Sequence, residues 1–521
     1  MRRISDVVAH MARWRPDVEA AVFEGRRWSY GELDAQVDAL ARALLAAGVG
    51  KGDRVATLQT PRPEFLVSLL ATASIGAIWV GLNPRYRADE IVRIVTHARP
   101  SLLISRSEIG GRRYDEDLEL ARRACGRRPR LIVFDGDPVP EGAAALEELL
   151  GAGAGTSDSE LARAREQCGG REPCMIVYTS GSTGVPKGAL LGHEGILEFC
   201  REQNRLWPVD PVRVLNYFPI NHVGCVIDLA LPCLLAGGCI VFMERFEAAR
   251  SLELAAAERV TLLGSVPSVF HLQLAVPQFE SYDLSALQLI VFEGAPMPAA
   301  LIDRLLLLGV PLATNYGMTE TTSAITALAP TRDAELLANT VGNAFDGVDL
   351  KLMRDDGEEA APGEAGEVWA RSRYNLIGYW NDAQATSRAL TRDGFFRTGD
   401  LAVRRGDGRY TLVGRLREMF KSGGYNVYPR EIETVLEAHP GVAAAAVVGV
   451  PDPLWQEVGV AFVEMRGPLE IAALEAWCRE RLANYKRPKR FEIVPALPLL
   501  PIGKVDRQAL RRAALGQASQ P

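Results

Sequence analysis

The segment Tyr178-Thr179-Ser180-Gly181-Ser182-Thr183-Gly184-Val185-Pro186-Lys187-Gly188-Ala189 says most about the architecture of this chain. It follows the apolar run Met175 to Tyr178, which predicts a short buried strand. Glycines let backbone N–H groups converge on an anion, hydroxyls donate hydrogen bonds, and a lysine neutralises charge. A loop of this composition directly after a strand predicts a binding site for a polyphosphate.

The segment differs from a Walker A loop, because no Gly-Lys-Ser/Thr follows a glycine at the required spacing. A kinase or GTPase of that type is therefore disfavoured. The alternative is a polar surface turn, since connectors rich in serine, threonine and glycine are common. Lysine makes up only 7 of the 59 basic residues, and Lys187 and Lys504 both stand in glycine-containing segments. A compact ammonium suits a phosphate oxygen whose position changes during a reaction.

Helices and strands alternate on both sides of this segment, which predicts layered α/β sheets. Residues 341–411 are Gly-rich and turn-punctuated, as in a β-rich subdomain, and the last hundred residues resemble a separate small α/β unit. A Gly/Ala/Ser stretch at 151–159 predicts an exposed loop. The expected helices are 30–47, 63–75, 431–438, 471–482 and one in the Arg-rich tail, and the expected strands include 54–58 and 443–450.

Composition limits the class of protein. The chain has 521 residues, so at least two domains are expected. Hydrophobic residues make up 48% and charged residues 24%, which excludes wholesale disorder and fibrous repeats. The net charge of −6 provides no field that would attract nucleic acid or an anionic membrane, so no nucleic-acid partner is expected.

Neither a membrane span nor a secretory signal is predicted. The apolar stretches 66–82 and 226–243 are interrupted by polar residues, glycine or proline and are interpreted as buried core. The N-terminus lacks an apolar run followed by a small-residue cleavage site, so a cytoplasmic location is expected. Eight cysteines show no Cys-x-x-Cys pair, which favours reduced, buried thiols.

Together with Ser29-Tyr30-Gly31-Glu32-Leu33 and Gly503-Lys504, the phosphate-binding segment resembles the adenylate-forming enzymes. This superfamily comprises acyl- and aryl-CoA ligases, peptide-synthetase adenylation domains and beetle luciferases. The resemblance spans essentially the whole chain. It implies an α/β protein with a large N-terminal domain of layered α/β sheets and a β-rich subdomain (1–417), followed by a small mobile C-terminal α+β domain (418–521). The hinge would lie near Glu418, and a homodimer is a further expectation.

The resemblance also implies which residues bind ATP and Mg²⁺. Tyr316 would pack on adenine, Thr319 would reach the α-phosphate, and Glu320 would coordinate magnesium, which prefers one or two carboxylates plus phosphates and water. Glu293 stands where the family usually has a small residue. The other residues implied to bind the nucleotide are Thr179, Ser180, Gly181, Ser182, Thr183, Gly184, Lys187, Gly294, Ala295, Pro296, Asn315 and Gly317.

Three further positions follow from the same resemblance. Asp400 would accept hydrogen bonds from the ribose diol, and Arg415 would contact the nucleotide. Lys504 resembles the catalytic lysine that neutralises charge when a carboxylate attacks the α-phosphate. Gly423 and Gly424 resemble the loop lining the tunnel for the thiol of coenzyme A, where glycines allow a close backbone approach.

The resemblance implies a small-molecule carboxylic acid as the acyl substrate. The segment Phe218 to Ile227 matches the border of the family's acyl pocket and is mostly apolar. It has Asn221-His222 where an amino-acid substrate would call for aspartate, and Asp228 comes later. We therefore expect an apolar fatty or aromatic acid, with His222 as a gate or orienting residue or simply a packed histidine.

Three functions follow from the sequence. The first is an ATP-dependent acyl-CoA ligase, which forms an acyl-adenylate and then a thioester. The second is an adenylating enzyme that loads a carrier protein. The third is a non-catalytic nucleotide- or acyl-binding relative.

Overall fold

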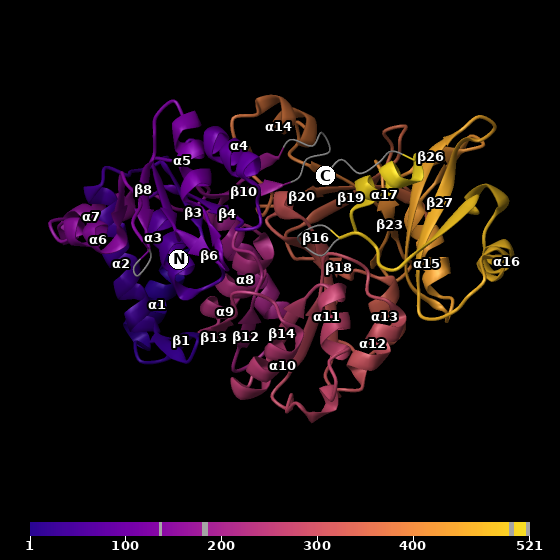
Figure 1. Ribbon diagram of the computed structural model, residues 1–521, viewed down its shortest axis with the longest axis horizontal. Coiled ribbons are helices and arrows are strands. Elements are labelled where there is room, and N and C mark those ends of the chain that lie inside the picture. The colour runs from indigo at the N-terminus through magenta and orange to yellow at the C-terminus, as the bar shows by residue number, and fades with distance from the viewer. Residues whose placement is uncertain (135–137, 180–185, 500–504, 517–521) are drawn as a thin grey trace.

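The computed structural model describes residues 1–134, 138–179, 186–499 and 505–516. Figure 1 shows two large α/β layers side by side, then a β-rich part and a C-terminal unit at the other end of the molecule. The mixed α/β class expected from the sequence is confirmed. Within these residues, no helix is both long and apolar enough to cross a bilayer.

The first large sheet contains the strand that leads into the phosphate-binding segment. Its strands β3, β4, β5, β8 and β10 are parallel, and β10 then pairs antiparallel with β11. The predicted strand 54–58 is β3. The order across the sheet is β21 (Gly378–Tyr379), β11 (Lys187–Gly192), β10 (Pro173–Thr179), β4 (Ile78–Leu82), β3 (Arg54–Leu58), β5 (Leu102–Ser105), β8 (Arg130–Val133) and β9 (Ala143–Ala145).

The second large sheet has a parallel centre, β13–β12–β14–β15–β16, whose carboxyl ends therefore meet at one edge. The order is β18 (Asn343–Ala344), β17 (Ala324–Ala327), β16 (Leu312–Gly317), β15 (Leu289–Phe292), β14 (Leu262–Ser265), β12 (Arg213–Asn216), β13 (Cys239–Phe242), β1 (Glu19–Phe23) and β2 (Arg26–Ser29).

Helices cover both large sheets. Those between the sheets carry the most apolar stretches. The helices of this part of the chain are α1 (Asp6–Trp14), α2 (Tyr30–Ala46), α3 (Pro63–Ser74), α4 (Ala88–Ala98), α5 (Asp115–Ala124), α6 (Leu146–Gly153), α7 (Asp158–Glu166), α8 (His193–Leu206), the π-helix η1 (Gly224–Ala230), α9 (Leu231–Leu235), α10 (Ala248–Ala257), α11 (Pro267–Leu274), α12 (Ala299–Leu306), α13 (Ala334–Asn339) and α14 (Ala383–Ala389). The predicted helices 30–47 and 63–75 are α2 and α3.

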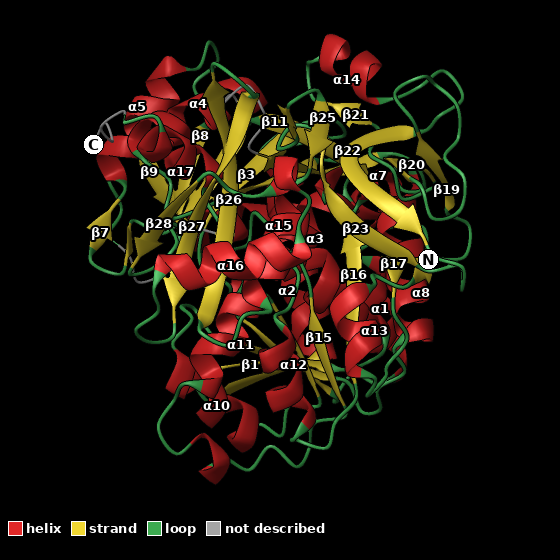
Figure 2. Ribbon diagram, turned by 90° about the vertical axis from the view of Figure 1, so that its right-hand side faces the viewer, coloured by secondary structure: helices red, strands yellow, loops and turns green. Residues whose placement is uncertain are grey.

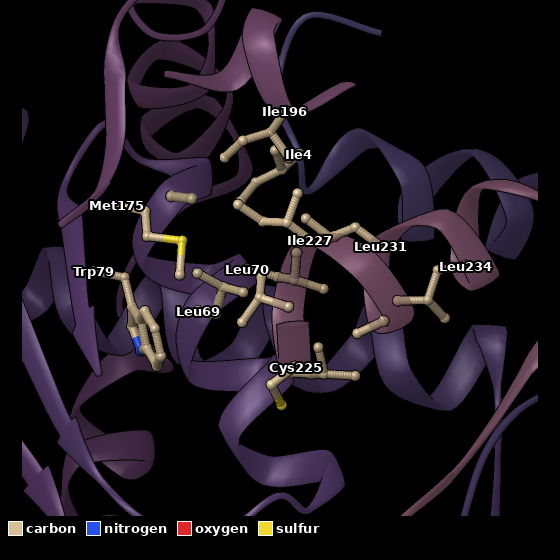
Figure 3. Packing of buried hydrophobic residues seen from close by; sticks show 14 of the residues in the cluster. Ile4, Leu69, Leu70, Trp79, Met175, Ile196, Cys225, Ile227, Leu231 and Leu234 are labelled. Carbon is tan, nitrogen blue, oxygen red and sulfur yellow. The ribbon is translucent and has the colours of Figure 1, made fainter. Parts of the chain in front are cut away.

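The largest hydrophobic core joins the two sheets. Leu69 and Leu70 of α3 pack there with Trp79 of β4 and with Cys225 and Ile227 of η1 (Figure 3). The stretches 66–82 and 226–243 are therefore core, as the sequence predicted. All eight cysteines are free and buried, which confirms the prediction of reduced thiols.

The prediction of an exposed loop at 151–159 is right only in part: most of the stretch is exposed, but only residues 154–157 lie outside helices. The stretch contains the end of α6 and the start of α7, joined by a short turn. Ser157 caps α7 by accepting a hydrogen bond from the backbone N–H of Glu160, and Glu160 completes a capping box. Gly153 packs so closely on α2 that a Cβ would lie 2.6 Å from the backbone nitrogen of Ala43. The small residues serve helix packing and capping.

The β-rich part predicted for 341–411 forms a separate antiparallel sheet, β19 (Asp349–Met353), β20 (Ala365–Arg371), β22 (Phe396–Arg404) and β23 (Tyr410–Arg415). The C-terminal unit is another sheet, in which β26 and β27 are long neighbouring strands (Figure 2). Its strands are β25 (Tyr425–Val427), β24 (Phe420–Ser422), β27 (Gln456–Met465), β26 (Val442–Asp452) and β28 (Arg490–Val494).

The predicted C-terminal helices are α15 (Pro429–Glu437), α16 (Ile471–Arg481) and, in the Arg-rich tail, α17 (Arg507–Ala514). α15 and α16 share one hydrophobic cluster with the sheet, and α17 contributes to another. Strand β23 ends at Arg415 and β24 begins at Phe420, so Glu418 lies in the connection between two sheets. A hinge at Glu418 stays a prediction.

Candidate active site

The carboxyl ends of the parallel strands bring the predicted residues together. Phe218 to His222 follow β12, Gly294 to Pro296 follow β15, and Asn315 to Gly317 end β16. Thr319 and Glu320 lie in the short 3₁₀ turn η3 (Thr319–Thr321) just beyond. Ligands of open α/β sheets bind at this edge, so the position of these segments suits a substrate site.

Glu320 connects the two large sheets. Its Oε1 accepts hydrogen bonds from Oγ1 of Thr179, the last residue of β10, at 3.3 Å and from the hydroxyl of Tyr379 in β21 at 2.9 Å. Thr179 and Lys187 are partners across the β10–β11 ladder, and the Lys187 ammonium lies 5.2 Å from the centroid of the Tyr379 ring. Burial, together with the charge of Glu320, raises the pKa of Tyr379 above its ordinary value.

This arrangement fits a magnesium ion. A hydroxyl and a phenol hold the Glu320 carboxylate beside the phosphate-binding segment, and carboxylate oxygen is a ligand that Mg²⁺ prefers. Among the described residues, no three His, Cys, Asp or Glu side chains gather to hold a metal by themselves. A magnesium ion bound here would draw its other ligands from ATP phosphates and water.

Asp400 forms a second cluster with Tyr316 and Arg415. Asp400 and Arg415 face each other across the β22–β23 ladder, and their side chains form an ion pair of 2.9 Å. The Tyr316 hydroxyl donates to the other oxygen of Asp400 at 3.0 Å. The Asp400 carboxylate raises the pKa of Arg415, and burial raises that of Tyr316, with the charge of Asp400 adding to it. The cluster holds one buried carboxylate between an arginine and a tyrosine hydroxyl.

His222 follows β12 and Asn315 lies in β16, so the two stand on opposite sides of β15 in the sheet. Nδ1 of His222 accepts a hydrogen bond from the backbone N–H of Gly224 at 3.0 Å, and its ring stacks near Phe218. The Asn315 side-chain amide donates to Glu293 at 3.1 Å. Gly294, Ala295 and Pro296 are exposed.

The C-terminal unit carries Gly423 and Gly424 in the turn between β24 and β25. Both have positive φ, at 58° and 84°, which side chains rarely adopt. A Cβ on Gly423 would lie 2.8 Å from the Trp455 ring, whereas Gly424 has open space around it. Ser180, Gly181, Ser182, Thr183, Gly184 and Lys504 lie outside the described residues.

Two contacts in the site were not predicted from the sequence. Tyr379, which contacts both Glu320 and Lys187, belongs to no motif that was recognised, and only its β-rich neighbourhood was predicted. Asp228 lies close enough to Glu293, 65 positions later in the chain, for the charge of Glu293 to raise the pKa of Asp228. Each acid was noticed separately, but sequence spacing gives no signal that the two meet.

Comparison with known proteins covers both parts of the chain. The model of the AMP-binding enzyme family matches residues 8–380, and that of the AMP-binding enzyme C-terminal domain matches residues 431–504. The chain is 37% identical over 506 residues to a feruloyl-CoA synthase of an Amycolatopsis species, covering 96% of this chain and 97% of the relative.

Two other similarities are equally extensive. The indoleacetate–CoA ligase of Aromatoleum aromaticum is 35% identical over 520 residues, with 98% of each chain covered. The crystal structure of ATP-bound MatB from Rhodopseudomonas palustris superposes with a TM-score of 0.86 at 28% identity, covering 98% of this chain and 99% of that one.

Proposed function

Because this chain belongs to the AMP-binding enzyme family and is an AMP-forming acid–CoA ligase, we propose that it activates an apolar acid with an aromatic ring. The observation that carries this proposal is the full-length similarity to the feruloyl-CoA synthase and the indoleacetate–CoA ligase, whose named acids both contain an aromatic ring. The mostly apolar segment after β12 supports the same substrate class. The relatives favour neither a carrier-protein ligase nor a non-catalytic binder.

In the first half-reaction, the substrate carboxylate attacks the α-phosphorus of ATP and pyrophosphate leaves. We propose that Thr179 and Lys187, with Ser180 to Gly184, bind the phosphates, and that Thr319 binds the α-phosphate. Glu320 would hold magnesium, which supplies charge neutralisation for the phosphate oxygens. Because Thr179 and Tyr379 already hydrogen-bond Glu320, its carboxylate needs little reorganisation.

Asp400 is proposed to accept hydrogen bonds from the ribose diol, with Arg415 held beside it by an ion pair. Tyr316, Asn315, Gly317 and the exposed residues Gly294 to Pro296 would form the adenine side. Tyr316 would contribute to nucleotide binding in two ways. Its ring face would pack on adenine, and its hydroxyl, which donates a hydrogen bond to Asp400, would orient that carboxylate toward the ribose.

In the second half-reaction, the thiol of coenzyme A attacks the acyl carbon and AMP leaves. We propose that residues 418–521 rotate about Glu418 between the two steps, and that Gly423 and Gly424 then admit the pantetheine arm. Lys504 would act in the first step only. A cytoplasmic location and a homodimer stay predictions, which fractionation of cells and light scattering of the purified protein can test.

The test is a direct assay of the purified chain with ATP, Mg²⁺ and CoA against benzoates, cinnamates, arylacetates and fatty acids, following AMP release and thioester mass. We expect thioesters from one or more aryl acids. Thioesters from fatty acids alone would contradict the aromatic substrate. In Lys504→Ala, adenylation should fall about a thousandfold, as expected for loss of a group that stabilises transition-state charge, while thioester formation from supplied acyl-adenylate should persist. Equal loss in both half-reactions would contradict the role of Lys504.

A further inference from the structure

One arginine of the C-terminal unit forms an ion pair with the connection that leads into this unit. Arg507 is the first residue of α17, and its Nε lies 3.0 Å from a carboxylate oxygen of Glu418. Glu418 stands between β23 and β24, where the chain passes from one sheet to the next. The two side chains are 25% and 30% exposed, so water screens the pair only in part.

The other nitrogens of Arg507 are fixed inside the C-terminal unit. Its two Nη atoms donate to the carboxylate of Glu433 at 2.6 and 2.9 Å, and Nη1 also donates to the carbonyl of Val447 at 3.0 Å. Glu433 lies in α15, is buried, and also accepts from the backbone N–H of Val447. A planar guanidinium held by two parallel hydrogen bonds keeps its orientation. The Nε–H that faces Glu418 therefore moves with the C-terminal unit.

Glu418, by contrast, is tied to the sheet that precedes the connection. The backbone N–H groups of Glu418 and Met419 both donate to the carbonyl of Arg415, at 3.1 and 3.0 Å, and Arg415 ends β23. The side chain of Arg415 in turn pairs with Asp400 of β22. The two members of the ion pair thus belong to different sheets. A large rotation of one sheet against the other must separate Arg507 from Glu418.

With this ion pair formed, the segment proposed for the pantetheine arm lies in the open. Apart from its chain neighbours, no described residue has an atom within 4 Å of a Cβ built on Gly424. The next residue, Tyr425, is 60% exposed and stacks on Tyr485 of the same unit. Thioester formation would need this segment to line a tunnel that leads to the acyl carbon. The arrangement with the ion pair formed is therefore the one suited to adenylation.

We propose that the Arg507–Glu418 ion pair holds the C-terminal unit in the adenylating arrangement and opens before the thioester forms. Arg507 is a positioning residue in this role, because it acts through Glu418 and not on a reacting atom. This inference rests on the proposed function, since it assigns a specific contact to the rotation between the two half-reactions.

The test is Glu418→Gln in the full-length enzyme, because the amide keeps the shape of the side chain and removes its charge. Pyrophosphate exchange measures adenylation, and thioester formation from supplied acyl-adenylate measures the second half-reaction. The ratio of the adenylation rate to the thioester rate should fall by about three- to tenfold, between the effects of an exposed ion pair and of a buried charge-assisted hydrogen bond. Adenylation should slow, while thioester formation should be at least as fast as in the wild type.

Two further variants sharpen this measurement. Glu418→Asp keeps the charge and should restore part of the ratio. Glu492→Gln is the matched control, because Glu492 pairs with Nε of Arg490 at the same distance of 3.0 Å, but both residues lie in β28. Its ratio should equal that of the wild type. An unchanged ratio in Glu418→Gln would overturn the proposal, and so would an equal loss in both half-reactions, which would indicate that the ion pair serves only stability.

Hydrogen exchange followed by mass spectrometry needs no substrate and keeps the ion pair separate from the ligase function. The amides of residues 418 and 419, which donate to Arg415, should exchange about three- to tenfold faster in Glu418→Gln and no faster in Glu492→Gln. If no acid yields a thioester but this difference is seen, the ligase function fails and the ion pair still holds the connection. If thioesters form and the rate ratio does not respond, the proposal for the ion pair fails alone.

Discussion

Asp400 and Asp228 are buried to nearly the same extent, with 5% and 7% of their surfaces exposed, yet their neighbours are opposite. Asp400 has an arginine at 2.9 Å and a tyrosine hydroxyl at 3.0 Å. Asp228 has a serine hydroxyl and a second carboxyl, and its pKa is raised by burial and by the charge of Glu293. Burial alone does not decide the charge of a carboxyl; the partner does.

This contrast separates the two halves of the site. On the nucleotide side, the Asp400 carboxylate, paired with Arg415, is suited to accept hydrogen bonds from a diol. On the acyl side, burial and the charge of Glu293 raise the pKa of Asp228, so its charge is more sensitive to its neighbours. The following substitutions test this division.

The largest effect is expected from Glu320→Gln. The amide keeps its shape and can still accept from Thr179 and Tyr379, but it loses the charge that would hold magnesium. Adenylation should fall by about 10²- to 10³-fold, the size typical for loss of one transition-state charge stabiliser. Carboxylate-dependent pyrophosphate exchange measures it. A loss of less than about threefold would show that Glu320 is not the metal-binding carboxylate.

Asp400→Asn should have the next largest effect. The substitution leaves Arg415 without its partner and weakens the bonds to the ribose, so the KM for ATP should rise about 10- to 30-fold, the effect of one charge-assisted hydrogen bond. The KM for the acid should change little. Steady-state kinetics with each substrate varied separately shows the difference. An equal rise in both values would mean that the nucleotide and acyl halves are not separate.

Tyr379→Phe should be milder. The ring that faces the Lys187 ammonium remains, while the hydrogen bond to Glu320 is lost. We expect a three- to tenfold reduction in adenylation kcat, less than the full contribution of a hydrogen bond to a charged group, because Thr179 still donates to the same oxygen of Glu320. Thr179→Val removes the other hydrogen bond to Glu320 and is the natural comparison. No change in either variant would indicate that Glu320 is oriented by other groups.

The smallest effect concerns stability and pH. Because the folded pKa of Asp228 is raised, the folded state binds more protons than the unfolded chain once the pH exceeds the ordinary aspartate value. The wild type should therefore lose stability as the pH rises through this window, up to the raised pKa. Asp228→Asn removes this contribution. The difference in Tm between the variant and the wild type should therefore be a few degrees more favourable to the variant at pH 8 than at pH 4.5.

Thermal unfolding by circular dichroism at both pH values provides the measurement. Asp400→Asn should change Tm in the opposite direction. It removes the ion-pair partner of Arg415, so Tm should fall. A pH-independent difference between Asp228→Asn and the wild type would mean that Asp228 titrates alike in the folded and unfolded chains.

Much of this molecule could be predicted from its sequence, because the signals are local. Helix α2 carries a capping box at Ser29 and helical apolar spacing, and the buried strand β3 matches its predicted bounds. The segments around Asn315, Asp400 and Gly423 could be singled out as candidate site segments because each is a short motif that resembles one of the family's motifs. The meeting of the segments after β12 and β15 with the end of β16 at one sheet edge follows from parallel topology, whereas Asp400 and Gly423 belong to other, antiparallel sheets.

The errors and omissions have a common cause in tertiary contacts. Gly153 was interpreted as part of a loop, yet it allows α6 to approach α2. The contact of Tyr379 with Glu320 depends on β21 joining the end of the first sheet through β11. The pairing of Asp228 with Glu293 requires a π-helical turn to meet the end of a strand from elsewhere in the chain. Local sequence patterns do not indicate such long-range contacts.

The eight buried cysteines bear on how this ligase can be assayed. Burial raises the pKa of thiols such as Cys125, Cys168 and Cys478, so the native protein presents little thiolate to a colorimetric thiol reagent. Consumption of free coenzyme A can then be followed with such a reagent against a low protein background. Any slow rise in that background reports molecules that have opened, so one cuvette records both turnover and unfolding.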